Sequence, residues 1–331
     1  SSQDDHRASS GRTIIQGPAA LTASATRLGG LGAAGGSGGQ APLVTVTPVP
    51  LNPTAPSQHR IGTLAYAGGL ILTSADDSGF HDLSDLEVSA DGWLVAIGDK
   101  GQFVRARLAF DDRGHLTGLT DLVASRLRGL DGAPLRDKQE SDAEGLARLG
   151  NGDLLVSFEQ QHRIWRYPAD GAPPQPVSSP AGPFSDNAGL EALSADPDRG
   201  PNAYLVGAEE SGQTWRCAID TACEPDVKVD LPPHFGLVAI RTLPQHRRAW
   251  LLRAAIRGNS RITNAIAVRI TDADGQTLDE QRLQPPVTVD NLEGLSVVTR
   301  PDGTLRFYLV SDDNTPTLTQ RTLLLAFDWR P

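Results

Sequence analysis

The chain has 331 residues and a formal net charge of −10, with 34 Gly and 24 Pro but only 5% aromatic residues. An acidic chain without a Lys/Arg run argues against a nucleic-acid groove, which needs a basic stripe to neutralise phosphates. No stretch approaches eighteen consecutive apolar residues, so no membrane-spanning helix is expected. The many turn-forming residues favour an all-β chain of short strands over long helices.

Residues 1–57 are rich in Gly, Ala, Ser, Thr and Pro. This composition predicts a low-complexity, mobile N-terminal tail, followed by one domain over residues 58–331. Within the tail, LVTVTPV at 43–49 has strand character. It could pair with an exposed sheet edge or with another subunit, which would make the tail an interaction arm for self-association.

One hairpin recurs along the domain. Each copy reads as a short apolar strand after a glutamate, a turn rich in Asp, Gly, Asn or Pro, and a second β-rich strand that ends in an acid. The glutamates are Glu87, Glu144, Glu191 and Glu293, and residues 235–257 have the same shape without one. The first two steps, 57 residues from 87 to 144 and 47 from 144 to 191, are close to the size of a four-stranded propeller blade.

Outer strands are predicted after the hairpins, at 103–111, 162–170, 213–220, 264–275 and 321–329. The last hairpin is one strand short, and residues 60–74 can supply it. Closing the ring with strands from both termini removes the exposed sheet edges. The sequence therefore predicts an all-β fold, a β-propeller with five blades, six being the alternative.

Two features predict export. Cys217 and Cys223 bracket a short turn-like stretch, which suits a hairpin disulfide in an oxidising compartment, two unpaired thiols being the alternative. The chain also contains no Met, which is consistent with removal of a secretory signal. We therefore expect a periplasmic or extracellular protein.

The repeated glutamates predict a shared acidic site. The first strand of each blade lines the channel, so equivalent positions should converge on one mouth, and the second strand should return there with further acids. Gathered carboxylates repel one another unless their pKa values rise or a cation lies among them, and Ca²⁺ accepts six to eight oxygen ligands. The predicted metal ligands are Glu87, Glu144, Glu191, Glu293, Asp312 and Asp313. The alternative is that each glutamate caps backbone N–H groups or faces solvent.

The candidate catalytic residues lie beside these acids in the sequence: Glu159, His162, Arg163 and Arg257. Glu159 or His162 would accept a proton. The arginines present a planar fork that suits phosphate or carboxylate. The alternative is a surface histidine and arginines that form ion pairs with blade acids.

Residues 58–331 resemble the bacterial family named for the esterase-like activity of phytase. The motifs that carry the resemblance are SDLEVSADGWLVAIGDKGQF, ESDAEGLARLGNGDLLVSFEQQHRIWRY, DNLEGLSVV, YLVSDDN and QRTLLLAF. The resemblance implies a secreted or periplasmic propeller that hydrolyses carboxylic or phosphate esters. The positions that match its acid motifs are Glu87, Glu144, Glu159, Glu191, Glu293, Asp312 and Asp313. Phe235 and Gly236 stand where the fourth repeat would carry its glutamate, so one side of the ring is expected to be open or apolar.

Two functions are consistent with these features. The first is a Ca²⁺-assisted hydrolase of a small anionic ester, with a phosphoester favoured. The second is a non-catalytic, calcium-stabilised propeller that acts in extracellular binding or assembly through its N-terminal tail.

Overall fold

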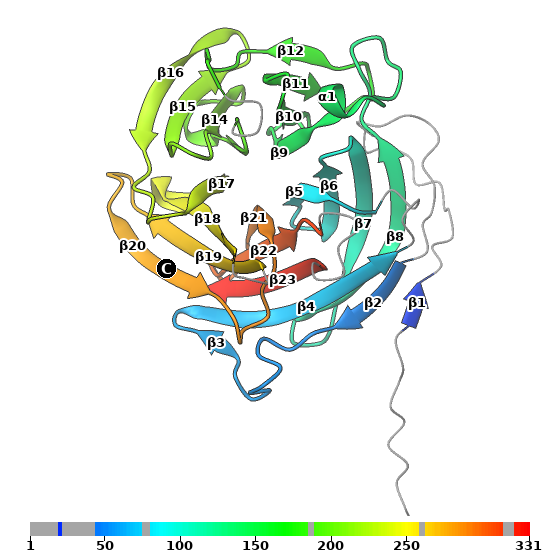
Figure 1. The fold of residues 1–331 in the computed structure, drawn as a ribbon, viewed down its shortest axis with the longest axis vertical. Helices are drawn as coiled ribbons and strands as arrows, with labels where there is room; N and C mark the ends of the chain where they lie inside the picture. The colour runs from blue at the N-terminus through cyan, green and yellow to red at the C-terminus, as the bar shows by residue number, and fades with distance from the viewer. Residues whose placement is uncertain (1–18, 22–43, 75–79, 185–188, 258–261, 314–320) are drawn as a thin grey trace, which may run out of the picture.

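Five antiparallel sheets stand around a central channel in the computed structural model, as the blades of a β-propeller (Figure 1). This arrangement confirms the predicted fold class and blade number. The structure describes residues 19–21, 44–74, 80–184, 189–257, 262–313 and 321–331. No helix in these ranges is long and apolar enough to cross a membrane.

Blades 1 to 4 are each a four-stranded meander whose first strand lies innermost. Blade 1 consists of β5 (Leu83–Val88), β6 (Trp93–Gly98), β7 (Gln102–Phe110) and β8 (Leu116–Arg126). Blade 2 consists of β9 (Ala143–Arg148), β10 (Leu154–Phe158), β11 (Arg163–Tyr167) and β12 (Gln175–Val177). Blade 3 consists of β13 (Ala192–Ala195), β14 (Ala203–Gly207), β15 (Gln213–Ala218) and β16 (Thr221–Lys228). Blade 4 consists of β17 (Gly236–Thr242), β18 (Arg248–Arg257), β19 (Ile262–Thr271) and β20 (Thr277–Leu283).

Blade 5 closes the ring with strands from both ends of the chain, as the sequence predicts. Its inner strands are β21 (Leu292–Thr299), β22 (Leu305–Ser311) and β23 (Thr322–Trp329), and β4 (Leu64–Ser74) pairs with β23. On the outer side, β2 (Val44–Pro48) pairs with β4, β1 (Ala19–Leu21) pairs with β2, and β3 (Arg60–Ile61) forms a short hairpin with β4. The strand predicted at 43–49 therefore adds to a sheet edge of its own chain.

The end of the predicted tail packs on the propeller rather than standing apart from it. Val44 and Leu51 are each 1% exposed and lie in hydrophobic clusters with blade residues. The backbone N–H of Thr288 also donates to the carbonyl of Leu51 at 2.7 Å. Residues 22–43 and 1–18, the remainder of the tail apart from β1, lie outside the described residues.

The hydrophobic core lies between neighbouring blades. The described part of the chain contains five buried clusters, and each draws its side chains from two adjacent blades. All residues of β10 and β14 are buried, whereas most of the outermost strand β16 is exposed. Inner strands are covered on both faces by the adjacent blades, which explains why they read as continuous apolar runs while outer strands are polar.

Short helices and tight turns connect the strands. The helices are α1 (Lys138–Ser141) and the 3₁₀ turns η1 (Pro197–Arg199) and η2 (Pro244–His246). The inner hairpins of blades 1 and 5 turn at Gly92 (φ +86°) and Gly303 (φ +84°), and each follows an aspartate. Positive φ is readily adopted by glycine, which explains the repeated Asp-Gly pair in the sequence.

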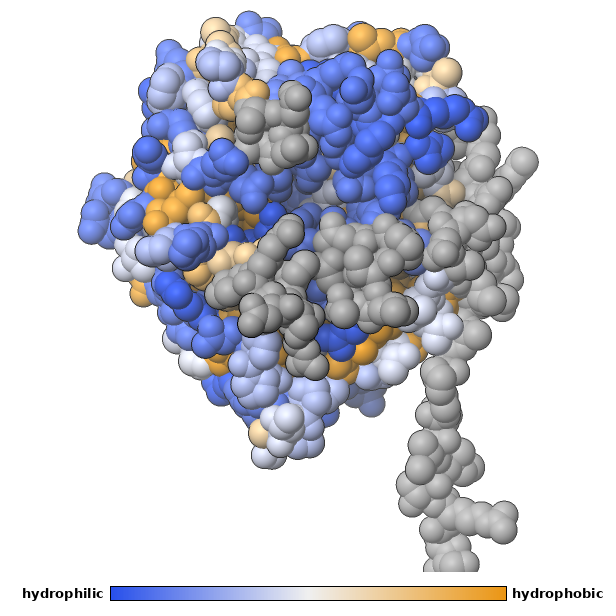
Figure 2. All heavy atoms as spheres, in the orientation of Figure 1, coloured by the Kyte–Doolittle hydropathy of each residue, from blue (hydrophilic) through white to orange (hydrophobic). Residues whose placement is uncertain are grey.

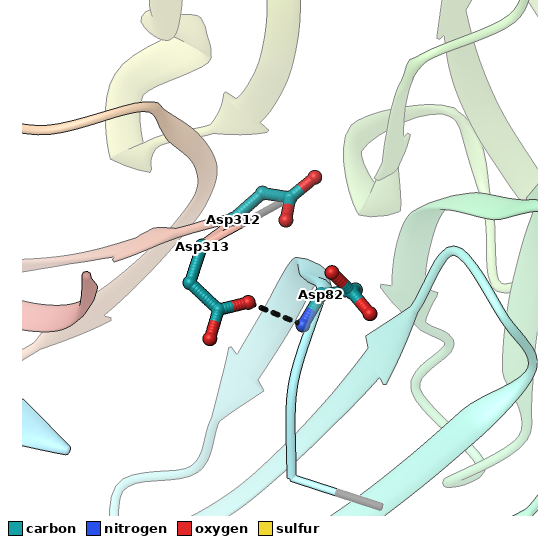
Figure 3. A group of neighbouring side chains, drawn as sticks. All are labelled: Asp82, Asp312 and Asp313. Atoms are coloured by element: carbon teal, nitrogen blue, oxygen red, sulfur yellow. Dashed lines mark hydrogen bonds between the residues drawn. The ribbon is translucent and has the colours of Figure 1, made fainter. Parts of the chain in front are cut away.

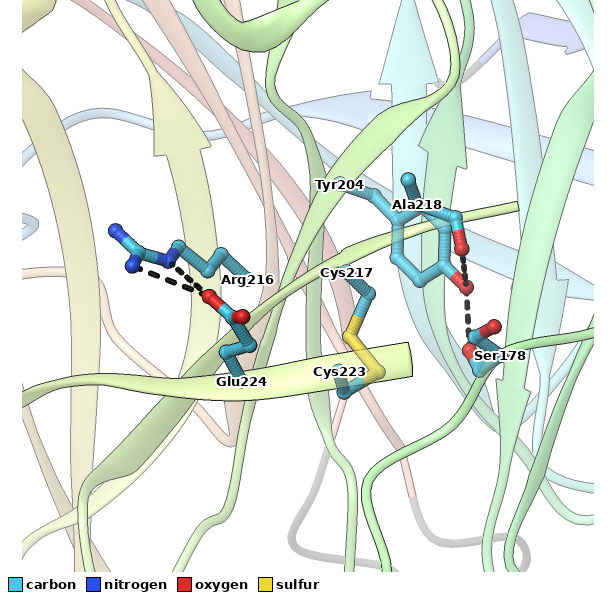
Figure 4. Close-up of a disulfide and its surroundings, with 7 residues drawn as sticks. All are labelled: Ser178, Tyr204, Arg216, Cys217, Ala218, Cys223 and Glu224. Atoms are coloured by element: carbon cyan, nitrogen blue, oxygen red, sulfur yellow. Dashed lines mark hydrogen bonds and ion pairs between the residues drawn. A yellow bond between two sulfur atoms is a disulfide. The ribbon is translucent and has the colours of Figure 1, made fainter. Parts of the chain in front are cut away.

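A disulfide joins Cys217 and Cys223 across the outer hairpin of blade 3, as predicted (Figure 4). Cys217 lies in β15 opposite Tyr204 of β14, whose hydroxyl donates to the carbonyl of Ser178. The bond therefore ties the outermost strand β16 to the buried interior of its blade.

Candidate functional site

The second strands of the blades end at one mouth of the channel and bring charged residues there. The backbone N–H of each such residue donates to a carbonyl in the segment that leads into the blade's first strand: Asp99 to Asp82 at 3.0 Å, Glu159 to Asp142 at 2.8 Å, Glu209 to Gly189 at 3.3 Å and Asp312 to Asn291 at 3.0 Å. In blade 4 the register pairs Arg253 with Gly236. We call the resulting set the acidic mouth: Asp82, Asp99, Asp142, Glu144, Glu159, Glu191, Glu209, Glu293, Asp312 and Asp313.

Three of the four repeated glutamates occupy equivalent places at this mouth. Glu144 lies where the register of β9 against β10 shifts, and Glu293 lies at the same shift between β21 and β22. Glu191 directly precedes the first pair of β13 with β14. In blade 4 the equivalent place belongs to Val238, at the register shift of β17 against β18. The fourth repeat therefore lacks the acid, as the sequence indicates, but the residue in its place is Val238 and not Phe235 or Gly236, because the register shift lies two residues further along β17.

Glu87 lies elsewhere. In blade 1 the register shift falls at Ser84, and Glu87 pairs with Val95 three residues further along β5. Three residues of strand correspond to about 10 Å along the channel. There its carboxylate accepts from the backbone N–H of Arg148 at 3.3 Å and lies 3.4 Å from Arg241. The motifs SDLE and SDAE match in sequence, but the register shift falls at Ser84 in blade 1 and at Glu144 in blade 2. The two glutamates therefore differ by three residues in their position along the first strand.

Cations at the mouth neutralise part of its charge. Lys100 lies 2.6 Å from Asp82, and Lys138 lies 2.7 Å from Asp142 and 3.2 Å from Asp99. Both ammonium side chains are nearly half exposed. On the face seen in Figure 2, hydrophilic side chains gather over α1, which carries Lys138, and over the strands of blade 2.

Arg253 enters from the blade that lacks an acid. Its guanidinium pairs with Glu209 at 3.0 Å, forms an ion pair with Glu293, and donates to the amide oxygen of Asn291 at 2.9 Å. Blade 4 therefore contributes a cation between the carboxylates of blades 3 and 5.

Asp312 and Asp313, two of the predicted ligands, lie together just after β22. They face Asp82, which belongs to the segment before β5 (Figure 3). The carboxylate oxygens of the three residues lie within 4.8 Å of one another. Asp313 accepts from the backbone N–H of Asp82 at 2.9 Å and pairs with His81 at 2.7 Å. Much of this cluster is therefore held by groups of the protein itself.

A second cluster, Asp142, Glu144 and Glu159, also has carboxylate oxygens within 4.8 Å of one another. Asp142 is held by Lys138 and by the side-chain amide of Gln160 at 2.7 Å. Glu159 is only 8% exposed, and its Oε1 is fully buried without a hydrogen-bond partner among the described residues. A buried, partnerless carboxylate oxygen is costly, so it marks a place where a ligand atom would complete the structure.

Burial and mutual repulsion raise the pKa values in this region. Burial, followed by the charges of Asp142 and Glu209, raises the pKa of Glu159 to about 7. The pKa of Glu144 is raised well above its usual value by burial and by the Glu191 carboxylate. Burial, followed by the charge of Glu209, likewise raises the pKa of Glu191 well above its usual value. Such groups favour either a proton or a bound cation.

His162 borders the second cluster. A Cβ built on Gly189 would lie 2.4 Å from its Nδ1, so the ring occupies space that only a glycine leaves open. The same Cβ would lie 3.5 Å from Cγ of Glu159. On its other side the ring meets Phe184 edge to face at 5.4 Å. The structure thus brings two candidate catalytic residues, Glu159 and His162, to one place.

Arg163 does not face the carboxylates. Its guanidinium lies over the rings of Phe158 and Trp165, at 4.2 and 4.4 Å from their centroids, and it donates to the backbone carbonyl of Glu140 in α1. These contacts hold α1, and with it Lys138, against blade 2. The side chain of Arg257, at the end of β18, lies outside the described residues.

Deeper in the channel, Arg241 of β17 crosses the axis. It donates to the backbone carbonyls of Leu193 at 2.6 Å, Leu86 at 2.8 Å and Leu146 at 3.0 Å, and it pairs with Asp85 at 3.3 Å. These acceptors belong to blades 1, 2 and 3.

Asp85 connects the remaining blade. Its carboxylate accepts from the backbone N–H groups of Leu146 at 2.8 Å and Leu295, of blade 5, at 3.2 Å. We call the three side chains of Asp85, Glu87 and Arg241 the axial ion pair, in which one cation is shared by two acids. Through their hydrogen bonds these side chains link all five blades. A single Asp within LSDLEV and a single Arg within FGLVAIRTL are the signals from which sequence reasoning could have found it.

A family model described as "Phytase-like: Esterase-like activity of phytase" matches residues 78–315. Several solved structures are similar in fold. They include regucalcin, a calcium-binding protein from Agrobacterium tumefaciens (14% identity, 79% of this chain and 80% of that one, TM-score 0.43). They also include the PQQ-bound aldose sugar dehydrogenase from Streptomyces coelicolor (12% identity, 75% and 95%, TM-score 0.45) and the major Malassezia sympodialis allergen Mala s 1 (12%, 82% and 91%, TM-score 0.44). A search of curated proteins found no match. At these identities and scores the structural similarity carries no argument about activity.

Proposed function

From the premise that the chain belongs to the phytase-like family of esterase-like activity, we propose that it is a divalent-cation-dependent hydrolase of small anionic esters. Phosphoesters are the favoured substrates, and the acidic mouth is the reaction site. The observation that carries the proposal is the buried Oε1 of Glu159, which lacks a partner beside Asp142 and Glu144.

The donor set fits Ca²⁺. Asp142, Glu144 and Glu159 offer carboxylate oxygens only, which are the ligands that this hard cation prefers. Glu191 is a further candidate because its carboxylate lies close enough to raise the pKa of Glu144. When bound there, Ca²⁺ would polarise an ester oxygen and orient water.

The protein's own residues supply the other requirements of hydrolysis. Lys100 and Lys138 present half-exposed ammonium groups at the rim, where an anionic ester would meet them first. His162, which lies against Gly189 beside Glu159, would accept a proton from water. Arg163 acts as a positioning residue, since it holds α1 and therefore Lys138.

The predicted secretion is part of this proposal. A disulfide in an outer hairpin is typical of proteins that work in oxidising compartments, and Ca²⁺ is abundant outside the cytosol. We therefore place the activity in the periplasm or the extracellular space.

The test is an assay of 4-nitrophenyl phosphate and 4-nitrophenyl acetate hydrolysis with Ca²⁺ or with a chelator. We expect chelation and the substitution Glu144→Gln each to lower phosphate ester hydrolysis by roughly tenfold or more. Glu224→Gln is the matched control, because Glu224 is exposed on the outer edge of blade 3. Hydrolysis that ignores both chelation and Glu144→Gln would contradict the proposed mechanism. Calcium binding without hydrolysis of either ester would instead favour the non-catalytic, calcium-stabilised propeller.

A further inference from the structure

A cleft lies between blades 1 and 5, at the end of the channel strands opposite to the acidic mouth. It is lined by the inner hairpin turn of blade 1, including Ala90, and by that of blade 5, including Arg300. Its volume is about 530 Å³, within the range of sites that bind small organic molecules. The length of β5 separates these turns from the acidic mouth by about 20 Å.

The walls of the cleft are mainly apolar. Phe110, at the end of β7, is 39% exposed, an unusual exposure for a large aromatic ring, and it lines the cleft with Val298 and Pro301. Tyr308, also part of the lining, is only 3% exposed. Such a surface suits the flat apolar body of a ligand rather than an ion alone.

Two arginines line the same cleft, and they differ in burial and in hydrogen bonding. Arg306 is nearly fully buried and bonded to both oxygens of Asp328, at 2.5 and 3.0 Å, and to the carbonyl of Gly114 at 2.7 Å. Arg300 forms no ion pair and no side-chain hydrogen bond among the described residues, although it is half-buried. Its guanidinium rests against Gly114, where an added Cβ would lie 3.0 Å from Nη2.

An acid near Arg300 is already engaged. Asp302 accepts from the backbone N–H of Thr304 at 2.9 Å and lies 3.7 Å from Arg330. Arg300 therefore offers a charged fork beside an apolar wall without a carboxylate of the protein bonded to it. A guanidinium of this kind forms its strongest contacts with a carboxylate, in a bidentate geometry.

We propose that this cleft is a second ligand site, which binds a small aromatic carboxylate with its ring on Phe110 and Val298 and its carboxylate on Arg300. This inference goes beyond the proposed hydrolase function and does not rest on it, since no residue of the acidic mouth lines the cleft.

The test is a fluorescence titration of the full chain with 2-naphthoate and with its neutral counterpart, 2-naphthalenemethanol. Wild type is expected to bind the carboxylate more tightly than the alcohol. Arg300→Gln should weaken 2-naphthoate binding about tenfold or more and leave the alcohol almost unchanged. Arg216→Gln, which removes a partly exposed arginine on the outer side of blade 3, away from the cleft, should change neither.

A second variant tests the apolar wall. Ala90 is exposed in the turn, so Ala90→Trp fills the cleft without disturbing the core, and it should abolish binding of both compounds. Glu144→Gln should leave both titrations unchanged, which separates this site from the acidic mouth. No binding to wild type, equal binding of the two compounds, or 2-naphthoate binding that survives both Arg300→Gln and Ala90→Trp would each overturn the proposal.

Discussion

The axial ion pair and the acidic mouth lie along the same channel, but they treat buried charge in opposite ways. At the axis, Arg241 faces Asp85 and Glu87, so each buried charge has an opposite charge beside it. Backbone groups of the surrounding blades hydrogen-bond Asp85 and the Nη atoms of Arg241, and only Nε of Arg241 has no partner among the described residues. At the mouth, Arg253, Lys100 and Lys138 are outnumbered by carboxylates, and Glu159 keeps a buried oxygen without a partner.

The difference indicates which region serves the fold and which serves a ligand. Buried charges in a protein are normally paired because an unpaired one costs several kcal/mol. A network that pairs its own charges needs nothing from outside, so the axial ion pair is a structural element. A cluster that leaves carboxylates unpaired is complete only with a proton or a cation, so the acidic mouth is where we expect binding and chemistry.

The largest effect is expected from breaking the axial ion pair. Arg241→Gln leaves Asp85 and Glu87 buried without their cation, which should lower the free energy of unfolding by about 3 to 5 kcal/mol. Denaturant unfolding measures this loss. The double variant Arg241→Gln with Asp85→Asn removes both charges of the Arg241–Asp85 pair. Its free energy of unfolding should therefore fall by less than that of the single variant. A single-variant loss below about 1 kcal/mol would contradict the structural role of the pair.

A smaller, pH-dependent effect should distinguish the mouth. The pKa of Glu159 is raised to about 7 in the folded chain from an ordinary value near 4.5, so the folded state binds a proton that the unfolded state releases between these pH values. In chelator, the free energy of unfolding should therefore fall as the pH rises through this window. Saturating Ca²⁺ should offset the fall, since a bound cation stabilises the ionised carboxylate.

Glu159→Gln is the control for this pH dependence. Burial also raises the pKa of Asp85, to about 6, which adds a fall of the same sign that Ca²⁺ should leave unchanged. Comparing wild type with Glu159→Gln at pH 5 and pH 7.5 removes that shared contribution. A stability difference between the two proteins that is the same at both pH values would show that Glu159 does not titrate as described.

Much of the fold follows from the sequence because a propeller repeats one physical unit. Each apolar strand, Asp-Gly or similar turn and second strand recurs at blade spacing, so blade number and closure by residues 60–74 could be inferred and are confirmed. The fate of residues 44–51 could not be inferred in the same way. Their Pro- and Thr-rich composition resembles the tail, and only the free edge of β4 and the apolar contacts of Val44 and Leu51 bring them into the fold.

The site was partly predictable for a related reason. Glu144, Glu191 and Glu293 lie at equivalent positions at the start of their blades' first strands, so alignment alone brings them together. Glu87 shows the limit of prediction from aligned motifs. Its three-residue offset depends on the register of β5 against β6, in which Leu83 pairs with Gly98, and the motif alone does not determine that register. Asp142 was missed because it lies just before β9, outside the repeated motif. It meets Glu159 because the backbone N–H of Glu159 donates to the carbonyl of Asp142, a contact that the sequence does not reveal.

The central claim is that Asp142, Glu144 and Glu159 together hold one divalent cation. The most direct measurement is a calorimetric titration of chelator-treated protein with Ca²⁺ at pH 7.5, for wild type, Glu144→Gln and Glu224→Gln. We predict one ion per chain in wild type and in Glu224→Gln, with an affinity about tenfold or more lower in Glu144→Gln. The absence of binding at millimolar Ca²⁺, or equal binding by all three proteins, would contradict it.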